Sequence, residues 1–276
     1  MCTKCDFLYK LIQYSKFRVR RTKMNRFYSI ITIIFFLTNI SYANTVTSNA
    51  KKLELVNIVS QQQILSQRIT KAYLYNGSVD KANRQLRNAL SSFYKTYSTI
   101  NTSTKSSKIR KIMTFIKKSS SEFKKLSKKP LNSKNSKLML ALSEKVLAKS
   151  KTVATLLKKS LKKEAYESVT KSGQQQMLAE RIAKYYIAYQ ANRNDKSIEK
   201  KMKSSIAQFS KNHKKLMKNK GNTKVIKRKL KEVNELWKRI SKLYKSKKLS
   251  SIVFTSTDDI SKKMKEVTKL YMVAYR

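Results

Sequence analysis

Apolar residues along this chain recur in alternating steps of three and four, which is the spacing of a helix that buries one face. Over residues 47–76, the expected buried face contains Leu55, Ile58, Gln62, Leu65, Ile69 and Ala72. The only strand candidate, residues 252–254, is too short and has no partner run. Only 3 Gly and 1 Pro occur among 276 residues, which is typical of long helices with few tight turns. The pattern therefore predicts an all-α fold.

Residues that stop helices divide this pattern into segments. Between residues 137 and 192 the only weak point is Gly173, so we predict one long helix there, or two nearly collinear ones. Elsewhere, breaks are predicted at Asn76-Gly77, at 101–107, at Pro130 with the loop 131–136, at 192–195 and at 219–222.

A phrase of eleven residues occurs twice in the chain. Its copies cover residues 61–71 and 174–184, and both contain three Gln followed by apolar residues, Arg and Lys at matching positions. The offset between the copies is 113 residues, and the apolar positions of the following helices recur at offsets of 114 to 116. Four helices therefore recur in the same order, which indicates an internal duplication rather than a short-period repeat.

Two sets of four helices favour two up-down four-helix bundles, over residues 44–160 and 161–276. If the helix over residues 137–192 is continuous, it joins the bundles end to end as a shared helix, roughly 84 Å long at ~1.5 Å per residue. An arrangement of eight helices side by side is the alternative.

The N-terminal segment has the pattern of a secretory signal. Residues 24–43 contain a basic start, an apolar run at 30–37 and small residues before a cleavage site after Ala43. The run is well short of the ~20 residues that span a bilayer, so a cleaved signal is favoured over a membrane anchor. Residues 1–23 form a long basic leader, unless Met24 is the true start. The sequence therefore predicts a periplasmic or secreted protein.

The chain is strongly basic, with 64 Lys and Arg against 15 Asp and Glu, for a net charge of +49. Lysines are spread over the whole chain and arginines are few, so specific nucleic-acid binding is not expected. Two interpretations remain: the lysines solvate the helix faces, or they bind an anionic partner such as lipopolysaccharide or a membrane surface.

Residues suited to catalysis or metal binding are scarce. Cys2 and Cys5 form a C-x-x-C pair without a second pair, and both precede the expected cleavage site. His213 is the only histidine and is expected to be exposed, while Asp258-Asp259 is expected to cap a helix N-terminus. The sequence therefore predicts no enzyme activity, no metal site and no cofactor.

The polar residues of the repeated phrase have two alternative roles. Gln62 and Gln175 fall on the buried faces, where an amide must be hydrogen-bonded, so they suit a register-setting role. Gln61 and Arg68 lie seven residues apart on one stripe, and the second copy repeats this arrangement. Amides beside a guanidinium suit a small oxyanion or carboxylate. The candidate ligand-binding residues are Gln61, Gln63, Arg68, Lys71, Gln174, Gln176, Arg181 and Lys184.

The phrase resembles the motif Asn-x-x-Gly-x-Gln-Arg-Met-Leu-Ser-Gln-Arg-x-x-Lys of the PilJ-type domain. This domain is the N-terminal sensory module of type IV pilus chemotaxis transducers, and it is related to the periplasmic domain of NarX-type nitrate/nitrite sensor kinases. The resemblance covers two tandem modules. Matching residues are Asn57, Gln62, Leu65, Ser66, Gln67, Arg68 and Lys71 in the first copy, and Gly173, Gln175, Met177, Leu178, Arg181 and Lys184 in the second.

The resemblance implies a sensory module that binds a small anion and signals through a membrane receptor or transducer, with a homodimer as a further option. The family's Arg that reaches the anion is replaced by Gln63 and Gln176, and Glu180 adds a negative charge in the second copy. Nitrate and nitrite are therefore disfavoured as ligands. The alternative function is that of a cationic periplasmic structural or adaptor protein that binds envelope polyanions.

Overall fold

The structure, a computed structural model, describes residues 25–158, 161–245 and 249–275, with side chains from residue 49 onward. Residues Thr47 onward form one compact unit, which contains both copies of the phrase. The leader predicted over residues 1–23 and the side chains of the predicted signal peptide lie outside the described part. No helix among the described residues is both long and apolar enough to cross a membrane.

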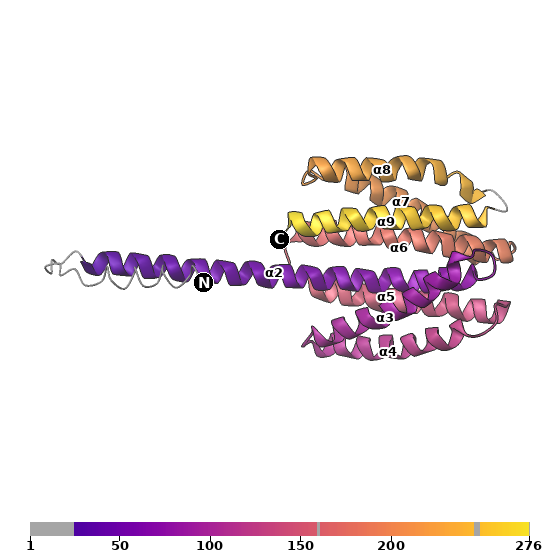
Figure 1. Cartoon of the computed structure of the whole chain (residues 1–276), viewed down its shortest axis with the longest axis horizontal. Helices are drawn as coiled ribbons and strands as arrows, with labels where there is room; N and C mark the ends of the chain where they lie inside the picture. The colour runs from indigo at the N-terminus through magenta and orange to yellow at the C-terminus, as the bar shows by residue number, and fades with distance from the viewer. Residues whose placement is uncertain (1–24, 159–160, 246–248, 276) are drawn as a thin grey trace, which may run out of the picture. The chain divides into compact units, whose positions relative to one another are not determined.

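The described residues are almost entirely helical and contain no strand, so the all-α prediction is confirmed (Figure 1). The helices of the first set are α2 (Asn25–Leu74), α3 (Lys81–Thr102), α4 (Ser107–Ser127) and α5 (Ser133–Lys158). The second set consists of α6 (Lys163–Ala191), α7 (Lys196–Met217), α8 (Lys224–Ile240), the short 3-10 helix η2 (Leu243–Lys245) and α9 (Ser250–Ala274).

Most helix ends lie at the predicted stop signals. Gly77 has a φ of 83° just after α2, a left-handed conformation that favours glycine at a helix C-terminus. Helix α4 ends at Ser127, shortly before Pro130. At the start of α7, the side chain of Asp195 accepts hydrogen bonds from the backbone N–H groups of Ser197 and Ile198, which caps the helix.

The helices surround two hydrophobic cores, and each core is formed mainly by one set. Leu53, Ile64 and Tyr75 of α2 join the core of the second set. In the first set, Phe93 and Phe123 pack edge to face with ring centroids 5.4 Å apart. In the second set, Phe209, which corresponds to Phe93, packs on Trp237 at 4.1 Å. The arrangement is bundle-like in both sets, because apolar side chains at helical spacing converge from all four helices.

The long shared helix predicted over residues 137–192 is wrong. Helix α5 ends at Lys158, Lys162 has an extended backbone with ψ of 129°, and α6 begins at Lys163. An ion pair between Glu144 of α5 and Arg181 of α6 shows that α6 folds back alongside α5. The two sets therefore lie side by side, as the alternative arrangement had it, rather than end to end (Figure 1).

Helices α2 and α6 lie against each other in parallel at the contact between the two sets. A Cβ atom added at Gly173 would lie only 2.8 Å from Cβ of Ser60, so the two helices lie close together at these residues. Further along, the Tyr75 hydroxyl donates a hydrogen bond of 3.3 Å to the carbonyl oxygen of Ala183. Because Ser60 and Gly173 are equivalent positions of the two copies, the repeats are related by an approximate twofold axis along this contact.

Candidate functional site

The two copies of the repeated phrase face each other across the contact between α2 and α6. Each copy places an arginine and a lysine against acidic or amide side chains that belong to the other repeat. The first cluster consists of Arg68, Lys71, Glu180 and Asp258, and the second consists of Arg181, Lys184, Gln67 and Glu144. The clusters are equivalent position by position, because Gln67 corresponds to Glu180 and Glu144 to Asp258.

In the first cluster, two cations share the buried carboxylate of Glu180. Arg68 contacts its Oε1 at 3.0 Å through Nε and at 2.6 Å through Nη2, and the Lys71 Nζ lies 2.7 Å from its Oε2. Burial by itself would raise the pKa of Glu180, but Arg68 and Lys71 outweigh it and hold the pKa at about 2. The side chains of Glu180 and Lys71 are both fully buried, so this ion pair holds the two repeats together away from solvent.

Asp258 completes the first cluster from α9. It is paired with Lys71 and accepts hydrogen bonds of 3.0 and 2.8 Å from the Gln85 amide, one at each oxygen. Burial and the nearby charge of Glu180 raise the pKa of Asp258, although Lys71 favours its charged form. The helix-capping role predicted for Asp258-Asp259 is wrong, because α9 begins eight residues earlier at Ser250.

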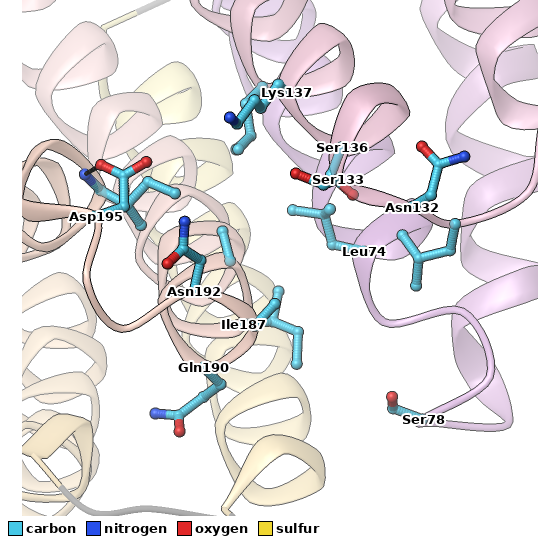
Figure 2. A pocket seen from close by; sticks show the side chains of 15 residues that line it. Leu74, Ser78, Asn132, Ser133, Ser136, Lys137, Ile187, Gln190, Asn192 and Asp195 are labelled. Atoms are coloured by element: carbon cyan, nitrogen blue, oxygen red, sulfur yellow. Dashed lines mark hydrogen bonds between the residues drawn. The ribbon is translucent and has the colours of Figure 1, made fainter.

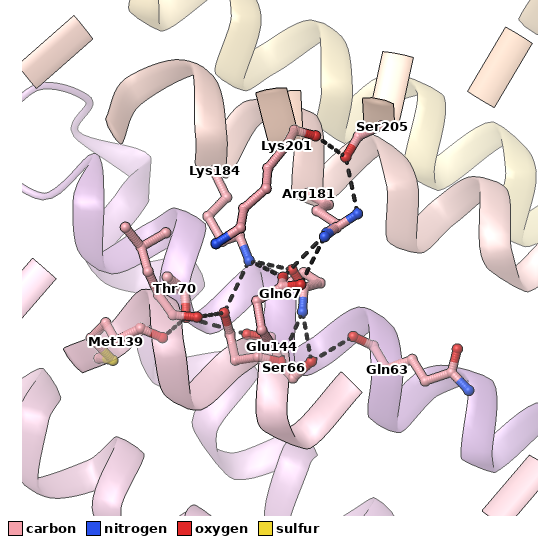
Figure 3. A network of polar contacts seen from close by, with 12 residues as sticks. Gln63, Ser66, Gln67, Thr70, Met139, Glu144, Arg181, Lys184, Lys201 and Ser205 are labelled. Atoms are coloured by element: carbon pink, nitrogen blue, oxygen red, sulfur yellow. Dashed lines mark hydrogen bonds and ion pairs between the residues drawn. The ribbon is translucent and has the colours of Figure 1, made fainter. Parts of the chain in front are cut away.

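The second cluster has the same layout with one carboxylate fewer (Figure 3). Arg181 contacts both oxygens of Glu144, at 3.2 Å through Nε and 2.7 Å through Nη2. The Lys184 Nζ lies 2.7 Å from Glu144 Oε1 and 2.5 Å from the amide oxygen of Gln67, and it also donates to the Ser143 hydroxyl at 3.0 Å. The second cluster therefore carries two cations against a single carboxylate.

This imbalance affects the ionisation of the second cluster. Burial lowers the pKa of Lys184 to about 8, although Glu144 favours its charged form, and Arg181 and Lys201 add repulsion. Burial also opposes the charge of Glu144, but Lys184 and Arg181 outweigh it and lower its pKa to about 2. Of the two cations in this cluster, Lys184 is therefore the one that loses its proton more readily, because the pKa of Arg181 is raised.

The predicted ligand-binding residues do not converge on a single pocket. Gln176 donates to the Thr268 hydroxyl at 2.8 Å, and Gln174 accepts from the Asn212 amide at 3.4 Å. Gln63 is buried and Gln61 is half-buried, and neither lies in the groove that Arg68 lines. The stripe predicted to join Gln61 to Arg68 thus forms no common site, because the guanidinium turns to Glu180.

Gln62 and Gln175, the glutamines on the buried helix faces, make the hydrogen bonds between helices that a register-setting role requires. Gln62 of α2 accepts from the Thr96 hydroxyl of α3. Gln175 of α6 donates to the carbonyl oxygen of Phe209 on α7 at 3.1 Å. The same position in each repeat therefore fixes its first helix against its second.

A groove of about 300 Å³ opens beside the first cluster, between α2, α3 and α9. Its polar lining includes Arg68 and Asp258 together with Lys81, Arg84, Gln85 and Asn88. Within the described ranges, neither Lys81 nor Arg84 forms an ion pair. Sequence reasoning missed these α3 residues, although their spacing of three and four places them on one helix face.

His213 is buried rather than exposed as predicted. Its Nε2–H donates to the carbonyl oxygen of Leu230 at 3.1 Å, its ring stacks on Phe209, and burial lowers its pKa to about 4. Across the part of the chain that the structure describes, no group of three or more His, Cys, Asp or Glu side chains is placed to hold a metal ion.

Comparison of the chain with protein-family models, with curated proteins and with solved structures gives no match. The resemblance to the PilJ-type domain thus stays a prediction that depends on the repeated phrase.

Proposed function

We propose that this chain is an exported sensory module of PilJ-like type, which binds a small anion in the groove beside the first cluster and signals through a membrane partner. The observation that carries the proposal is the excess of positive charge in this groove. Arg68, Lys81 and Arg84 line it against the single carboxylate of Asp258. Among the residues that the structure describes, no carboxylate pairs with Arg84 or Lys81, so these two cations are more available to a ligand than Arg68.

The groove chemistry suits an oxyanion or a carboxylate. A guanidinium donates two parallel hydrogen bonds to such a group, and the amide of Asn88 adds a neutral donor. An anion that recruits Arg68 competes with Glu180, which belongs to the other repeat. Binding would therefore weaken one link between α2 and α6, and this change at the contact between the repeats is the proposed signal.

Isothermal titration calorimetry of the full chain with a panel of small anions tests the proposal. The panel contains acetate, succinate, phosphate and sulfate, with nitrate and nitrite as the disfavoured cases. We expect saturable binding of at least one anion, weakened about tenfold or more in Arg84→Gln because a charge-assisted hydrogen bond is lost. The matched control is Arg87→Gln, which removes an exposed arginine of the same helix that does not line the groove.

Two results would contradict the proposal. One is the absence of saturable binding across the whole panel. The other is equal affinity of the anion for the unaltered chain and for Arg84→Gln.

The net charge of +49 favours a second candidate, a cationic envelope adaptor that binds polyanions. In this case heparin, as a model polyanion, should bind with an affinity that falls steeply with salt concentration. The affinity should be the same in Arg84→Gln and Arg87→Gln, since each removes one of many surface charges. The same pair of variants therefore separates the two candidate functions.

A further inference from the structure

A second cavity, of about 490 Å³, lies between the two repeats at the end of α2 and α6 that is distant from Ser60 and Gly173. Figure 2 shows the end of α2 and the start of α5 on one side, and the turn from α6 to α7 on the other. It shares no lining residue with the groove beside the first cluster. Its volume is in the range of small-molecule sites.

The approximate twofold symmetry explains why this cavity exists. At the equivalent place on the other side of the axis, Tyr75 and Phe254 pack edge to face with ring centroids 5.0 Å apart, and both side chains are fully buried. The residues that correspond to them are Ala188 and Leu140, and both line the cavity. Two aromatic rings on one side of the axis are thus replaced by smaller side chains on the other, which leaves the space open.

The cavity has an apolar floor and a polar rim. Leu74, Leu140, Ile187 and Ile198 supply the apolar part of the lining. The rim carries one side chain of each charge, with Lys137 on the α5 side and Asp195 on the α6–α7 side (Figure 2).

The charged rim groups remain available to a ligand. Lys137 and Asp195 form no ion pair with each other or with any other described residue. The hydrogen bonds that cap α7 use only Oδ1 of Asp195, at 3.0 and 3.1 Å, and leave Oδ2 for another donor.

From this geometry we infer that the cavity binds a small zwitterion with an apolar side chain, that is, a free amino acid of the leucine or phenylalanine type. The ligand ammonium group pairs with Asp195, its carboxylate pairs with Lys137, and its side chain packs on the apolar floor. The opposite charges on facing walls select a molecule that carries both groups at once. This site is independent of the proposed anion site and takes a different class of ligand.

Calorimetric titration of the full chain with L-leucine and with L-phenylalanine tests the inference. We expect saturable binding of at least one of them. Phenethylamine, which lacks the carboxylate, and N-acetylphenylalanine, which lacks the ammonium group, should each bind about tenfold more weakly or worse. Asp195→Asn retains a good helix cap, so its expected loss of about tenfold in affinity reports the lost charge rather than a frayed helix.

Variants that fill the cavity with the aromatic pair found at the equivalent place in the other repeat test whether the cavity is the binding site. The double variant Leu140→Phe with Ala188→Tyr introduces the pair found at Phe254 and Tyr75, and it should abolish amino-acid binding. Ala188→Leu fills less space and serves as a milder second variant. Lys137→Gln should weaken binding about tenfold, whereas Lys134→Gln, on the same first turn of α5 but outside the cavity, should leave it unchanged.

Three outcomes would overturn the inference. The first is that neither amino acid binds saturably. The second is binding that persists unchanged in both filling variants. The third is equal affinity for phenylalanine, phenethylamine and N-acetylphenylalanine, which would show that the paired charges play no part. Arg84→Gln should leave amino-acid binding unchanged, so failure of the anion site and failure of this site are distinguishable.

Discussion

The two charged clusters at the contact between the repeats share a layout and differ in charge. In the first cluster, Arg68 and Lys71 face two carboxylates, Glu180 and Asp258. In the second, the equivalent cations face one carboxylate, Glu144, because Gln67 occupies the position that corresponds to Glu180. The first cluster is therefore balanced, and the second carries one extra positive charge.

This difference sets the surroundings of the buried lysine in the second cluster. Lys71 and Lys184 are equivalent residues, and both side chains are fully buried. With one carboxylate, the burial cost dominates, and the pKa of Lys184 falls to about 8. The shared carboxylates behave alike in the two clusters, because the cations hold the pKa of Glu180 and that of Glu144 at about 2. The exchange of Glu180 for Gln67 between the clusters thus leaves Lys184 with one carboxylate, Glu144, to offset its burial.

The largest expected effect comes from making the first cluster like the second. Glu180→Gln leaves Arg68 without its carboxylate and Lys71 with Asp258 alone, in a buried setting. We expect the free energy of unfolding to fall by about 3 kcal/mol, in the range seen when one partner of a buried ion pair is removed. Urea unfolding at pH 7 measures the change as a lower midpoint with an unchanged slope.

The reciprocal change is the control for this experiment. Gln67→Glu gives the second cluster a carboxylate where Lys184 already places its ammonium group, 2.5 Å from the amide oxygen. Burial of the new charge is offset by the extra cation, so the stability should stay within about 1 kcal/mol of the unaltered chain. Similar losses in the two variants would show that the charge imbalance between the clusters has no energetic consequence.

The second prediction compares the cores of the two repeats through pH. His213 is buried in the second core, whereas the equivalent residue of the first repeat is Tyr97. The pKa of His213 is about 4 in the folded chain, below its ordinary value of 6.5, so the folded state disfavours the proton. The contribution of neutral His213 to the free energy of unfolding should be fully present above pH 6.5 and fall by about 3 kcal/mol as the pH drops to 4. The reason is that His213 takes up a proton more readily in the unfolded chain than in the folded chain.

His213→Phe provides the matched control for the pH experiment. It keeps a ring against Phe209 and removes the titration, so its stability should stay level between pH 6.5 and 5. Since the chain has only one histidine, no other side-chain imidazole contributes in this window. Chemical unfolding at a series of pH values measures the slope, and equal slopes for the two proteins would refute the assignment to His213.

The smallest expected change in stability comes from the contact between Ser60 of α2 and Gly173 of α6. In Gly173→Ala, the new Cβ would lie 2.8 Å from Cβ of Ser60, an atom that can move only with its backbone. The overpacking cost of about 1–3 kcal/mol exceeds the gain of about 1 kcal/mol for alanine over glycine in a helix. We therefore expect a net loss of about 1 kcal/mol, measured as a lower denaturation midpoint.

Exchanging the two residues across the axis sharpens this test. The double variant Ser60→Gly with Gly173→Ser moves the glycine to α2 and keeps one small gap at the crossing. The loss of unfolding free energy in the double variant should be smaller than the sum of the losses in the two single variants, because effects of residues in contact do not add. Strict additivity would mean that α2 and α6 do not meet at these residues.

Much of the fold could be predicted from the sequence, because the relevant signals are local. Gly77 and Pro130 stop helices through backbone conformation alone, and helical spacing located the apolar faces that form the two cores. The duplication was visible because equivalent helices repeat the same apolar positions. The position of Gln62 and Gln175 on the buried faces likewise predicted that their amides find partners on a neighbouring helix. One atom of each amide does so, Oε1 of Gln62 and Nε2 of Gln175.

The candidate site could be predicted only in part. The repeated phrase gave Arg68, Lys71, Arg181 and Lys184 as ligand-binding candidates, and this role stays a prediction. In the structure, each of them forms an ion pair at the contact between the repeats. Their partners, Asp258 and Glu144, lie on helices far along the chain and carry no local signal of such a role. The cavity was equally invisible, because it depends on Ala188 and Leu140 lying where larger rings lie on the other side of the axis.

By itself, the sequence determined that the chain is helical, that four helices recur in order, and which cations belong to the duplicated phrase. These properties follow from periodicity and from residues that act on their own backbone. Only the tertiary structure decided that α6 does not extend α5 but lies against α2. The reason is physical: this arrangement lets the cations of each copy reach carboxylates and amides of the other repeat, and such long-range pairing is not encoded in any local pattern.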